Sequence, residues 1–264
     1  MALDNGGARD LLREDRGKVA ILTMNRPEAR NALSESLLSD LQTELDRIKD
    51  DESIHVVVLR GEGPGFCAGH DLKEMMANRS RAYYEWLLEK CTRVMESIKA
   101  LPQPVIAAVH GIATAAGAQL AATCDMVIAS QEARFATPGV NIGTWCSTPM
   151  VAVSRSAHQK AAMEMLLTGD LYDAEAAQRF GLVNRVVPAT SLMDEALALA
   201  EKIAAKSRLV VSLGKEAFYR QGEMEQSDAY QYAAGVMTHN LLKDDASEGI
   251  KAFLQKRTPN WTNR

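Results

Sequence analysis

The fold class is decided by one stretch near the middle of the chain, Pro104-Val-Ile-Ala-Ala-Val-His-Gly-Ile-Ala-Thr-Ala-Ala-Gly-Ala-Gln-Leu-Ala-Ala-Thr-Cys-Asp-Met-Val-Ile-Ala129. Its two ends, 104–109 and 125–129, are short apolar runs of the kind found in strands buried on both faces of a sheet. The residues between them, 111–122, predict a turn followed by a short helix. The stretch therefore indicates two buried strands joined through a helix.

The same alternation continues on both sides of this stretch. Residues 19–24 and 56–59 predict two earlier strands, and Ser34 can cap a helix between them. Residues 182–187 predict a later strand, after a helix capped by Asp173. Strands that alternate with helices favour the α/β class. After Pro188 the pattern predicts helices only, over 192–206, 209–221, 229–242 and a last one that Asp245 opens with Glu248 at capping-box spacing.

We therefore divide the chain into a core, 1–190, and a C-terminal helical region, 191–264. The helices of the second region carry apolar side chains such as Phe218, Tyr230 and Met237. Such side chains either cover the chain's own core or pack onto a sister subunit. We expect association.

The composition excludes several classes of protein. The chain has 264 residues, of which 47% are hydrophobic and 24% charged, and its formal net charge is -4. These values are ordinary for a globular protein, and they give no reason to expect a nucleic acid or an anionic membrane as partner. Residues 100–124 carry no charge, but Ala and Gly dominate them, so a membrane span is disfavoured.

Cysteine spacing and the N-terminal segment indicate the compartment. The N-terminal segment, 1–16, mixes acidic residues with arginine and lacks the apolar run of a secretory signal. Widely spaced cysteines without a CxxC motif predict no metal site, and free thiols suit a cytoplasmic protein. These cysteines are Cys67, Cys91, Cys124 and Cys146.

Two turns rich in Gly and Ala, 61–72 and 110–119, each follow a predicted buried strand. Small residues let a backbone approach a ligand closely, and such turns present free N–H groups. Two N–H groups that face one carbonyl oxygen form an oxyanion hole. The alternative is that both turns are tight packing bends, and chemistry alone leaves both interpretations open.

A series of short motifs, in a fixed order, resembles the enoyl-CoA hydratase/isomerase (crotonase) superfamily. Two further stretches, Cys146-Ser-Thr-Pro149 and Phe253-Leu-Gln-Lys-Arg257, are similar to one subgroup of it. The motifs that carry the resemblance are Asn25-Arg-Pro27, Asn31-Ala-Leu33, Phe66-Cys-Ala-Gly-His-Asp-Leu72, Pro104-Val-Ile-Ala-Ala-Val-His-Gly111, Cys124-Asp125, Phe135-Ala-Thr-Pro138 and Gly181-Leu-Val183.

The resemblance implies a fold and a ligand. It implies a spiral of ββα units whose C-terminal helices hold together a homotrimer or a hexamer made of two trimers. It also implies an acyl-CoA thioester as substrate, with no cofactor beyond its CoA and no metal. The thioester oxygen would be held by the backbone amides of His70 and Ala116. The substrate would lie along Ala29, Arg30, Ala68, His70, Asp71, Leu72, Ala115, Gly117 and Trp145.

The chain departs from the hydratases of this superfamily at two positions. Hydratases use two glutamates to activate the water that they add, and the matching positions here are Gln119 and Gly139. Neither residue can exchange a proton, so neither can act as a general acid or base. The resemblance then implies another acyl-CoA reaction, such as thioester hydrolysis, decarboxylation of a malonyl-type thioester, or isomerisation with a replacement base. The alternative is a non-catalytic acyl-CoA binder.

Few residues could replace the two glutamates. His70 has a suitable side chain, whose ordinary pKa is about 6.5; the alternative is that only its backbone amide serves the site. Asp71 suits a helix cap better than a base. Cys146 would need a base beside it to act as a nucleophile, so we expect it to line the pocket. Gln119 could hold a water molecule or a carboxylate-bearing acyl group.

Overall fold

The computed structural model describes residues 9–264, so part of the N-terminal segment 1–16 considered above lies outside the described residues. Within the described range the strands form a six-stranded sheet and a three-stranded sheet. The strands are β1 (Leu11–Arg16), β2 (Val19–Met24), β3 (Val56–Gly61), β4 (Val105–Val109), β5 (Ile112–Thr114), β6 (Met126–Ser130), β7 (Arg134–Ala136), β8 (Tyr172–Asp173) and β9 (Arg185–Val187).

The larger sheet has the order β1-β2-β3-β4-β6-β9, and the smaller one the order β5-β7-β8. β1 pairs with β2 in the antiparallel sense, whereas every later neighbour in the larger sheet is parallel. The α/β class predicted from the sequence is therefore confirmed. The strands expected at 19–24, 56–59, 104–109 and 125–129 are all present, and the one expected at 182–187 is shorter.

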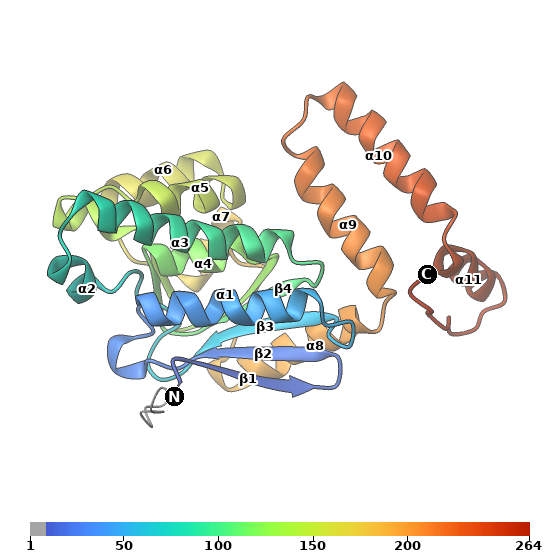
Figure 1. Ribbon diagram of the computed structural model, residues 1–264, viewed down its shortest axis with the longest axis horizontal. Coiled ribbons are helices and arrows are strands. Elements are labelled where there is room, and N and C mark those ends of the chain that lie inside the picture. Colours follow the sequence, from blue (N-terminus) through green and yellow to red (C-terminus); the bar gives the residue numbers. More distant parts are fainter. Residues whose placement is uncertain (1–8) are drawn as a thin grey trace.

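Helices cover both faces of the larger sheet and continue beyond it (Figure 1). Three short 3-10 helices lie in connections, over Pro27–Ala29, Pro138–Ile142 and Ala189–Ser191. The α-helices are α1 (Glu35–Lys49), α2 (Leu72–Ala77), α3 (Arg81–Ala100), α4 (Ala116–Thr123), α5 (Ser147–Ser156), α6 (Gln159–Thr168), α7 (Ala174–Phe180), α8 (Leu192–Ala204), α9 (Arg208–Gln221), α10 (Gln226–Leu241) and α11 (Asp244–Leu254).

A repeating unit explains how the two sheets are connected. In β4-β5-α4 and again in β6-β7-α5, the first strand joins the larger sheet, the second joins the smaller sheet, and a helix follows. Each unit advances the chain by one strand in the larger sheet. The ββα units implied by the resemblance are thus confirmed.

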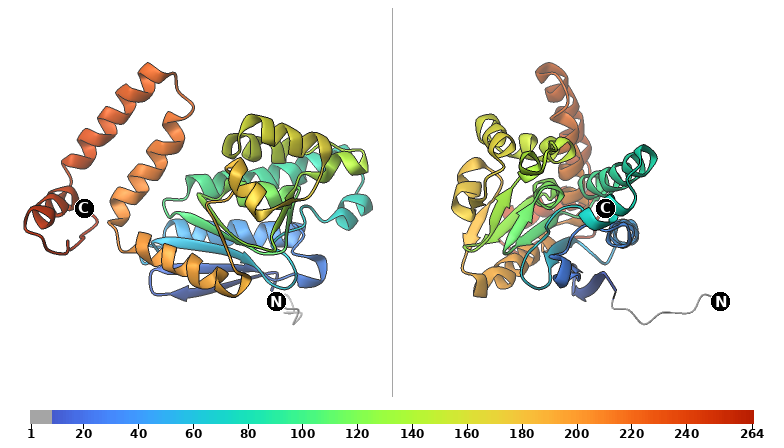
Figure 2. Two further views of the ribbon diagram at one scale, coloured as in Figure 1. Left: turned by 180° about the vertical axis from the view of Figure 1, so that it is seen from behind. Right: turned by 90° about the vertical axis from the view of Figure 1, so that its left-hand side faces the viewer.

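The two faces of the larger sheet have different helical covers. Along β3, Val57 and Leu59 face the cluster that contains α1, α3 and α4, while Val56 and Val58 face α8. This alternation follows from the two-residue period of a strand. Figure 2 shows α8 on the side of the sheet opposite to α1 and α3. α8 therefore packs on the core sheet, although it follows the division proposed at residues 190/191.

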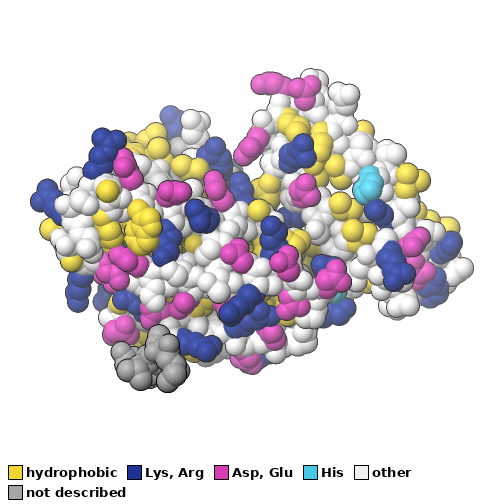
Figure 3. Space-filling model, in the orientation of Figure 1, with side chains coloured by type: hydrophobic (Ala, Val, Ile, Leu, Met, Phe, Trp, Pro, Cys, Tyr) yellow, Lys and Arg dark blue, Asp and Glu magenta, His cyan; other side chains and the backbone are white. Residues whose placement is uncertain are grey.

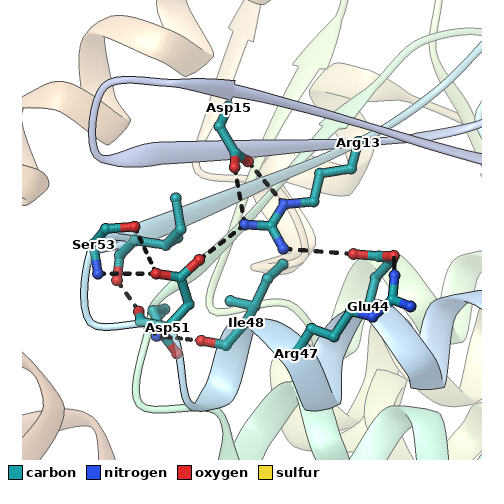
Figure 4. Close-up of polar contacts among 9 residues, drawn as sticks. Arg13, Asp15, Glu44, Arg47, Ile48, Asp51 and Ser53 are labelled. Atoms are coloured by element: carbon teal, nitrogen blue, oxygen red, sulfur yellow. Dashed lines mark hydrogen bonds and ion pairs between the residues drawn. The ribbon is translucent and has the colours of Figure 1, made fainter.

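A cluster of charged side chains fastens the edge strand β1 (Figure 4). The Arg13 guanidinium lies 2.8 Å from Oδ1 of Asp15, 3.1 Å from Oδ2 of Asp51 and 3.5 Å from Oε2 of Glu44. These partners come from β1, from the connection before β3, and from α1. One arginine thus ties three segments together at the rim of the sheet.

Helices α9, α10 and α11 form an arm that stands away from the core (Figures 1 and 2). Apolar side chains gather along it in Figure 3. No helix of residues 9–264 is both long enough and apolar enough to span a membrane. The exposed large apolar residues of the arm are Phe218, Tyr230, Met237, Leu241, Leu242, Ile250, Phe253 and Leu254.

The capping box expected at Asp245 and Glu248 is wrong. α11 begins at Asp244, and its N-cap is Lys243, two residues before the expected cap Asp245, with no side-chain cap. The buried Asp245 carboxylate instead accepts hydrogen bonds from the Ser207 hydroxyl and from backbone amides of the C-terminal tail, and Glu248 pairs with Arg257. Partners distant in sequence compete successfully for both carboxylates.

Candidate functional site

The two turns rich in Gly and Ala lie side by side. The amide of Phe66 donates to the carbonyl of His110 at 2.9 Å, and that of Cys67 donates to the carbonyl of Ile112 at 3.0 Å. In return, the amide of Thr114 donates to the carbonyl of Cys67 at 3.0 Å. These bonds bring the ends of β3 and β4 together and align the following residues.

Small residues are required where the two turns meet. A Cβ atom added to Gly117 would lie 2.0 Å from the carbonyl oxygen of Cys67, which is far inside contact distance. A Cβ atom on Gly69 would lie 3.0 Å from Cβ of Ala115 and 3.3 Å from the amide nitrogen of Ala116. Gly69 also has φ +98°, a value that glycine adopts without strain. The site therefore depends on a close approach of two backbones.

The amides of His70 and Ala116, one from each turn, donate to no protein acceptor within residues 9–264. The His70 amide lacks an acceptor because of the bonds on either side of it. The Leu33 amide donates to the carbonyl of Gly69, and the Leu33 carbonyl accepts from the amide of Asp71, so the His70 amide faces away from Leu33. Ala116 is the first residue of α4, where an amide has no acceptor within its own helix. Two such donors, together with the positive end of the α4 dipole, can bind one carbonyl oxygen.

Ala115 precedes the second donor in an unusual conformation. Its backbone has φ +51° and ψ -118°, a combination that is costly for any residue with a Cβ atom. A hydrogen bond from its amide to the carbonyl of Ala136, 2.9 Å long, fixes this conformation. The backbone is thereby turned so that α4 starts at Ala116.

The structure separates the possible roles of His70 and Asp71. Both ring nitrogens of His70 are buried without a hydrogen-bond partner, and burial lowers the pKa of the imidazole, so the ring is neutral near pH 7. Asp71 caps α2, as expected, and lies 3.1 Å from Nη2 of Arg26. Burial opposes ionisation of Asp71, but the Arg26 guanidinium and the α2 amides outweigh it and lower the pKa. The Asp71 carboxylate therefore already has an ion-pair partner and hydrogen-bond donors.

Neither glutamate position offers a titratable group. Gln119 is 5% exposed, and its Oε1 has no hydrogen-bond partner. Gly139 is buried beneath the turn that follows it, since an added Cβ would lie 3.0 Å from Sγ of Cys146 and from Oγ1 of Thr144. Burial raises the pKa of the Cys146 thiol, which is therefore protonated at neutral pH and unsuited to be a nucleophile.

The residues expected along the CoA chain lie at the rim of this contact. The amide of Ala68 donates to the carbonyl of Arg30 at 3.0 Å, which places 29–30 beside the first turn. The exposed Arg30 side chain forms no ion pair among residues 9–264 and is available to a phosphate. Leu72 and Trp145 are 54% and 40% exposed, and the Trp145 indole donates to Sδ of Met150.

Two residues with a part in the site, Asn31 and Arg26, received no role from the sequence. Asn31 is fully buried and donates to the carbonyls of Glu62 and Gly65, which holds the first turn in place. Arg26 donates to the carbonyl of Ala32 besides pairing with Asp71. Asn31 and Arg26 belong to quoted motifs, which was the available signal.

Comparison with known proteins agrees with this geometry. The family model described as enoyl-CoA hydratase/isomerase matches residues 14–264. The chain belongs to this family. It is 45% identical over 242 residues to the rat protein named enoyl-CoA hydratase domain-containing protein 3, mitochondrial, covering 92% of this chain and 81% of the relative. This is the subgroup indicated by Cys146–Pro149 and Phe253–Arg257.

Solved structures of this family have the same fold. A structure titled enoyl-CoA hydratase from Mycobacterium smegmatis is 52% identical, with a TM-score of 0.93, and covers 96% of this chain and 98% of its own. The human domain-containing protein 3 is 43% identical, also with a TM-score of 0.93, over 96% of this chain and all of its own. The crotonase fold expected from the motifs is therefore confirmed, C-terminal helices included.

Proposed function

We propose that this protein binds an acyl-CoA thioester and stabilises negative charge on the thioester oxygen through the amides of His70 and Ala116. The observation that carries the proposal is the convergence of these two donors, each without a protein acceptor among the described residues, on one contact between two turns. Removal of one such donor in other enzymes costs about 3–4 kcal/mol of transition-state stabilisation. The substrate's own CoA is the only group that this proposal requires.

The proposed reaction is not the hydration of an alkene. Water addition needs a base for the water and an acid for the carbon, and the positions expected to supply them are Gln119 and Gly139. A reaction that draws mainly on oxyanion stabilisation, such as thioester hydrolysis or an isomerisation assisted by His70, suits the residues present. The neutral, unpartnered His70 ring is the candidate proton acceptor.

A second candidate is a non-catalytic acyl-CoA binder or regulatory protein. It is supported by the same observation that argues against hydration: the described part of the site lacks a free carboxylate, since Asp71 is held by Arg26 and the α2 amides. Under this alternative the two turns and Arg30 still hold the thioester, but no proton is moved.

The first experiment follows the absorbance of the conjugated thioester of crotonyl-CoA, with purified protein, a buffer blank and an active hydratase. We expect no turnover together with measurable binding of CoA thioesters. Rapid loss of absorbance would show that another residue, His70 or Asp71, supplies the missing base. Absence of binding by any CoA thioester would overturn the proposal as a whole.

The proposal includes an oligomeric state for this chain. The exposed apolar side chains of the arm support a homotrimer, or a hexamer of two trimers, in which the arm packs on a second copy of the chain. Sedimentation velocity distinguishes these states.

Free cysteines support a cytoplasmic location, whereas the names of several relatives include the word mitochondrial. Fractionation of source cells decides between the two compartments.

A further inference from the structure

The direction of the His70 amide depends on Leu33, a residue of the segment that precedes α1. The amide of Leu33 donates to the carbonyl of Gly69 at 2.7 Å, and the carbonyl of Leu33 accepts from the amide of Asp71 at 3.2 Å. These two bonds hold the residues on both sides of His70. Whatever fixes Leu33 relative to Asp71 therefore also fixes the direction of the His70 donor.

Arg26 connects these two residues through its side chain. Its Nη1 donates to the carbonyl of Ala32, the residue before Leu33, at 2.6 Å, and its Nη2 lies 3.1 Å from Oδ2 of Asp71. One guanidinium can bind both partners because its N–H groups form a rigid planar fork. The bonds of Arg26 and those of Leu33 thus close a ring, and the residues on both sides of His70 belong to it.

The bridge made by Arg26 is anchored at both ends. The amide of Arg26 donates to Oδ1 of Asn31 at 2.8 Å, which fixes its backbone. Asp71 divides its carboxylate, since Oδ1 accepts from the amides of Lys73 and Glu74 at the start of α2 while Oδ2 faces Arg26. The two side chains are only 16% and 13% exposed, and burial strengthens a charge-assisted hydrogen bond.

Arg26 has no free terminal nitrogen for a ligand. Nη1 and Nη2 are bound to Ala32 and Asp71, and Nε lies 3.7 Å from Oδ2 of Asp10. Any effect of this side chain on a thioester therefore passes through the peptide group of His70.

We propose that Arg26 is a positioning residue, which joins the segment before α1 to Asp71 and thereby holds the His70 amide at the angle needed to bind the thioester oxygen together with the Ala116 amide. The inference rests on the proposed function and adds a residue to it. Hydrogen bonds weaken steeply when the N–H···O angle falls below about 120°. A loosened His70 peptide would thus leave Ala116 as the single effective donor.

The test uses two ligands that differ only at the carbonyl group. Acetyl-CoA has the thioester oxygen, whereas the thioether S-ethyl-CoA has a CH2 group in place of the C=O. The ratio of their calorimetric dissociation constants on the full chain measures the carbonyl contact, because CoA contributes equally to both. An assay of free thiol verifies that acetyl-CoA stays intact. We expect the native protein to bind acetyl-CoA about tenfold more tightly, as one or two net hydrogen bonds predict.

The variants remove the bridge in two ways. Arg26→Gln breaks both of its bonds and should lower the preference for acetyl-CoA about fivefold, the worth of one neutral hydrogen bond, while affinity for S-ethyl-CoA changes little. Arg26→Lys keeps the charge but lacks the planar fork, so it should lower the preference as well. It decides the test if Arg26→Gln does not fold.

The matched control is Arg13→Gln, at the arginine that fastens β1 (Figure 4). Its side chain is 22% exposed and pairs with several carboxylates, none of which belongs to either turn. The same change of residue type should therefore lower stability without changing the ratio of the two dissociation constants. A purely structural role of Arg26 would likewise leave the ratio unchanged.

An infrared measurement reads the same contact directly. Hydrogen bonds to a carbonyl oxygen lower its stretching frequency, so acetyl-CoA labelled with carbon-13 at the carbonyl should absorb at lower wavenumber when bound to the native protein than in solution. In Arg26→Gln the band should move back toward its position in solution. In Arg13→Gln it should stay where the native protein places it.

The possible failures are distinguishable. A preference for acetyl-CoA that is unchanged in both Arg26 variants, or that falls equally in Arg13→Gln, overturns the positioning role and leaves the proposed function intact. Equal binding of the two ligands by the native protein overturns the oxyanion contact of the proposed function, and the inference falls with it. If neither ligand binds, the proposed acyl-CoA site is overturned as a whole.

Discussion

Nζ of Lys215, in α9, lies 2.7 Å from Oδ2 of Asp125, immediately before β6. The same Nζ donates to the carbonyls of Ile98 and Gln103, and the hydroxyl of Tyr219 donates to Oδ1 of Asp125. Both charged side chains are almost completely buried, at 6% and 13% exposure. A single buried ion pair with its hydrogen bonds therefore ties the first helix of the arm to the end of α3 and to the central sheet.

The first prediction concerns this ion pair. Lys215→Met leaves the Asp125 carboxylate buried without its cation, and we expect the free energy of unfolding to fall by about 3–5 kcal/mol. Denaturant titration measures the change, and sedimentation reports whether assembly weakens with it. The control is Lys202→Met, at an exposed lysine of α8, which should change stability by less than about 0.5 kcal/mol. Equal effects of the two variants would contradict the role of the pair.

The second prediction concerns the strained residue beside the oxyanion donors. Ala115→Gly removes the Cβ atom that makes φ +51° costly, so we expect the free energy of unfolding to rise by about 1 kcal/mol, after the entropy cost of glycine is subtracted. Ala118→Gly, in the ordinary helical part of α4, should lower it by about 1 kcal/mol. Opposite signs in urea titrations support strain at Ala115. Destabilisation by both variants would show that the conformation carries no strain.

The third prediction concerns Gly139, which is buried beneath the turn that follows it. Gly139→Ala brings a Cβ atom to 3.0 Å from Sγ of Cys146, and the overpacking should cost about 1–2 kcal/mol of stability. Cys146→Ala removes the sulfur, so the double variant should lose less stability than the sum of the single losses. The coupling, about 0.5–1 kcal/mol, comes from a double-mutant cycle of unfolding free energies. Simple additivity would mean that Thr144, not Cys146, makes the contact that matters.

The third prediction also bears on restoring hydratase chemistry. Gln119→Glu together with Gly139→Glu reintroduces both carboxylates, but the second side chain collides with Cys146 and Thr144 unless the turn moves. We expect crotonyl-CoA hydration only when Cys146→Ala is added. Activity of the double variant alone would show that the turn yields readily.

The fourth prediction concerns pH. The pKa of Asp71 is lowered from 3.8 in the folded protein, so its ionisation contributes stability above the unfolded value, and that contribution is lost as the pH falls through the folded value. Asp71→Asn retains a good N-cap but loses the charge beside Arg26, and should cost about 1 kcal/mol at pH 7. Urea midpoints of the two proteins should differ at pH 7 and pH 5, and the difference should shrink as the pH falls below 3.8. A difference that persists undiminished at pH 3 would assign the effect to shape instead of charge.

Much of the fold could be predicted because the signals are local. Buried parallel strands such as 56–59 read as continuous apolar runs, and helix starts carry side-chain caps: Ser34 accepts from the amide of Leu37, and Asp173 from that of Ala176. The short strands β5, β7 and β8 were not predicted, because two or three residues are too few to display a period. The capping box at Asp245 failed because the C-terminal tail, distant in sequence, supplies the donors for that carboxylate.

The candidate site also has features that the sequence determined and features that only the tertiary structure decided. The sequence by itself determined the family, the two Gly- and Ala-rich turns, and the loss of titratable groups at Gln119 and Gly139, since residue identity alone settles whether a side chain can exchange a proton. Only the tertiary structure decided which amides lack acceptors and which polar side chains lack partners. His70 and Ala116 are brought together by the hydrogen bonds between the two turns, and hydrogen-bond satisfaction is a property of such tertiary contacts.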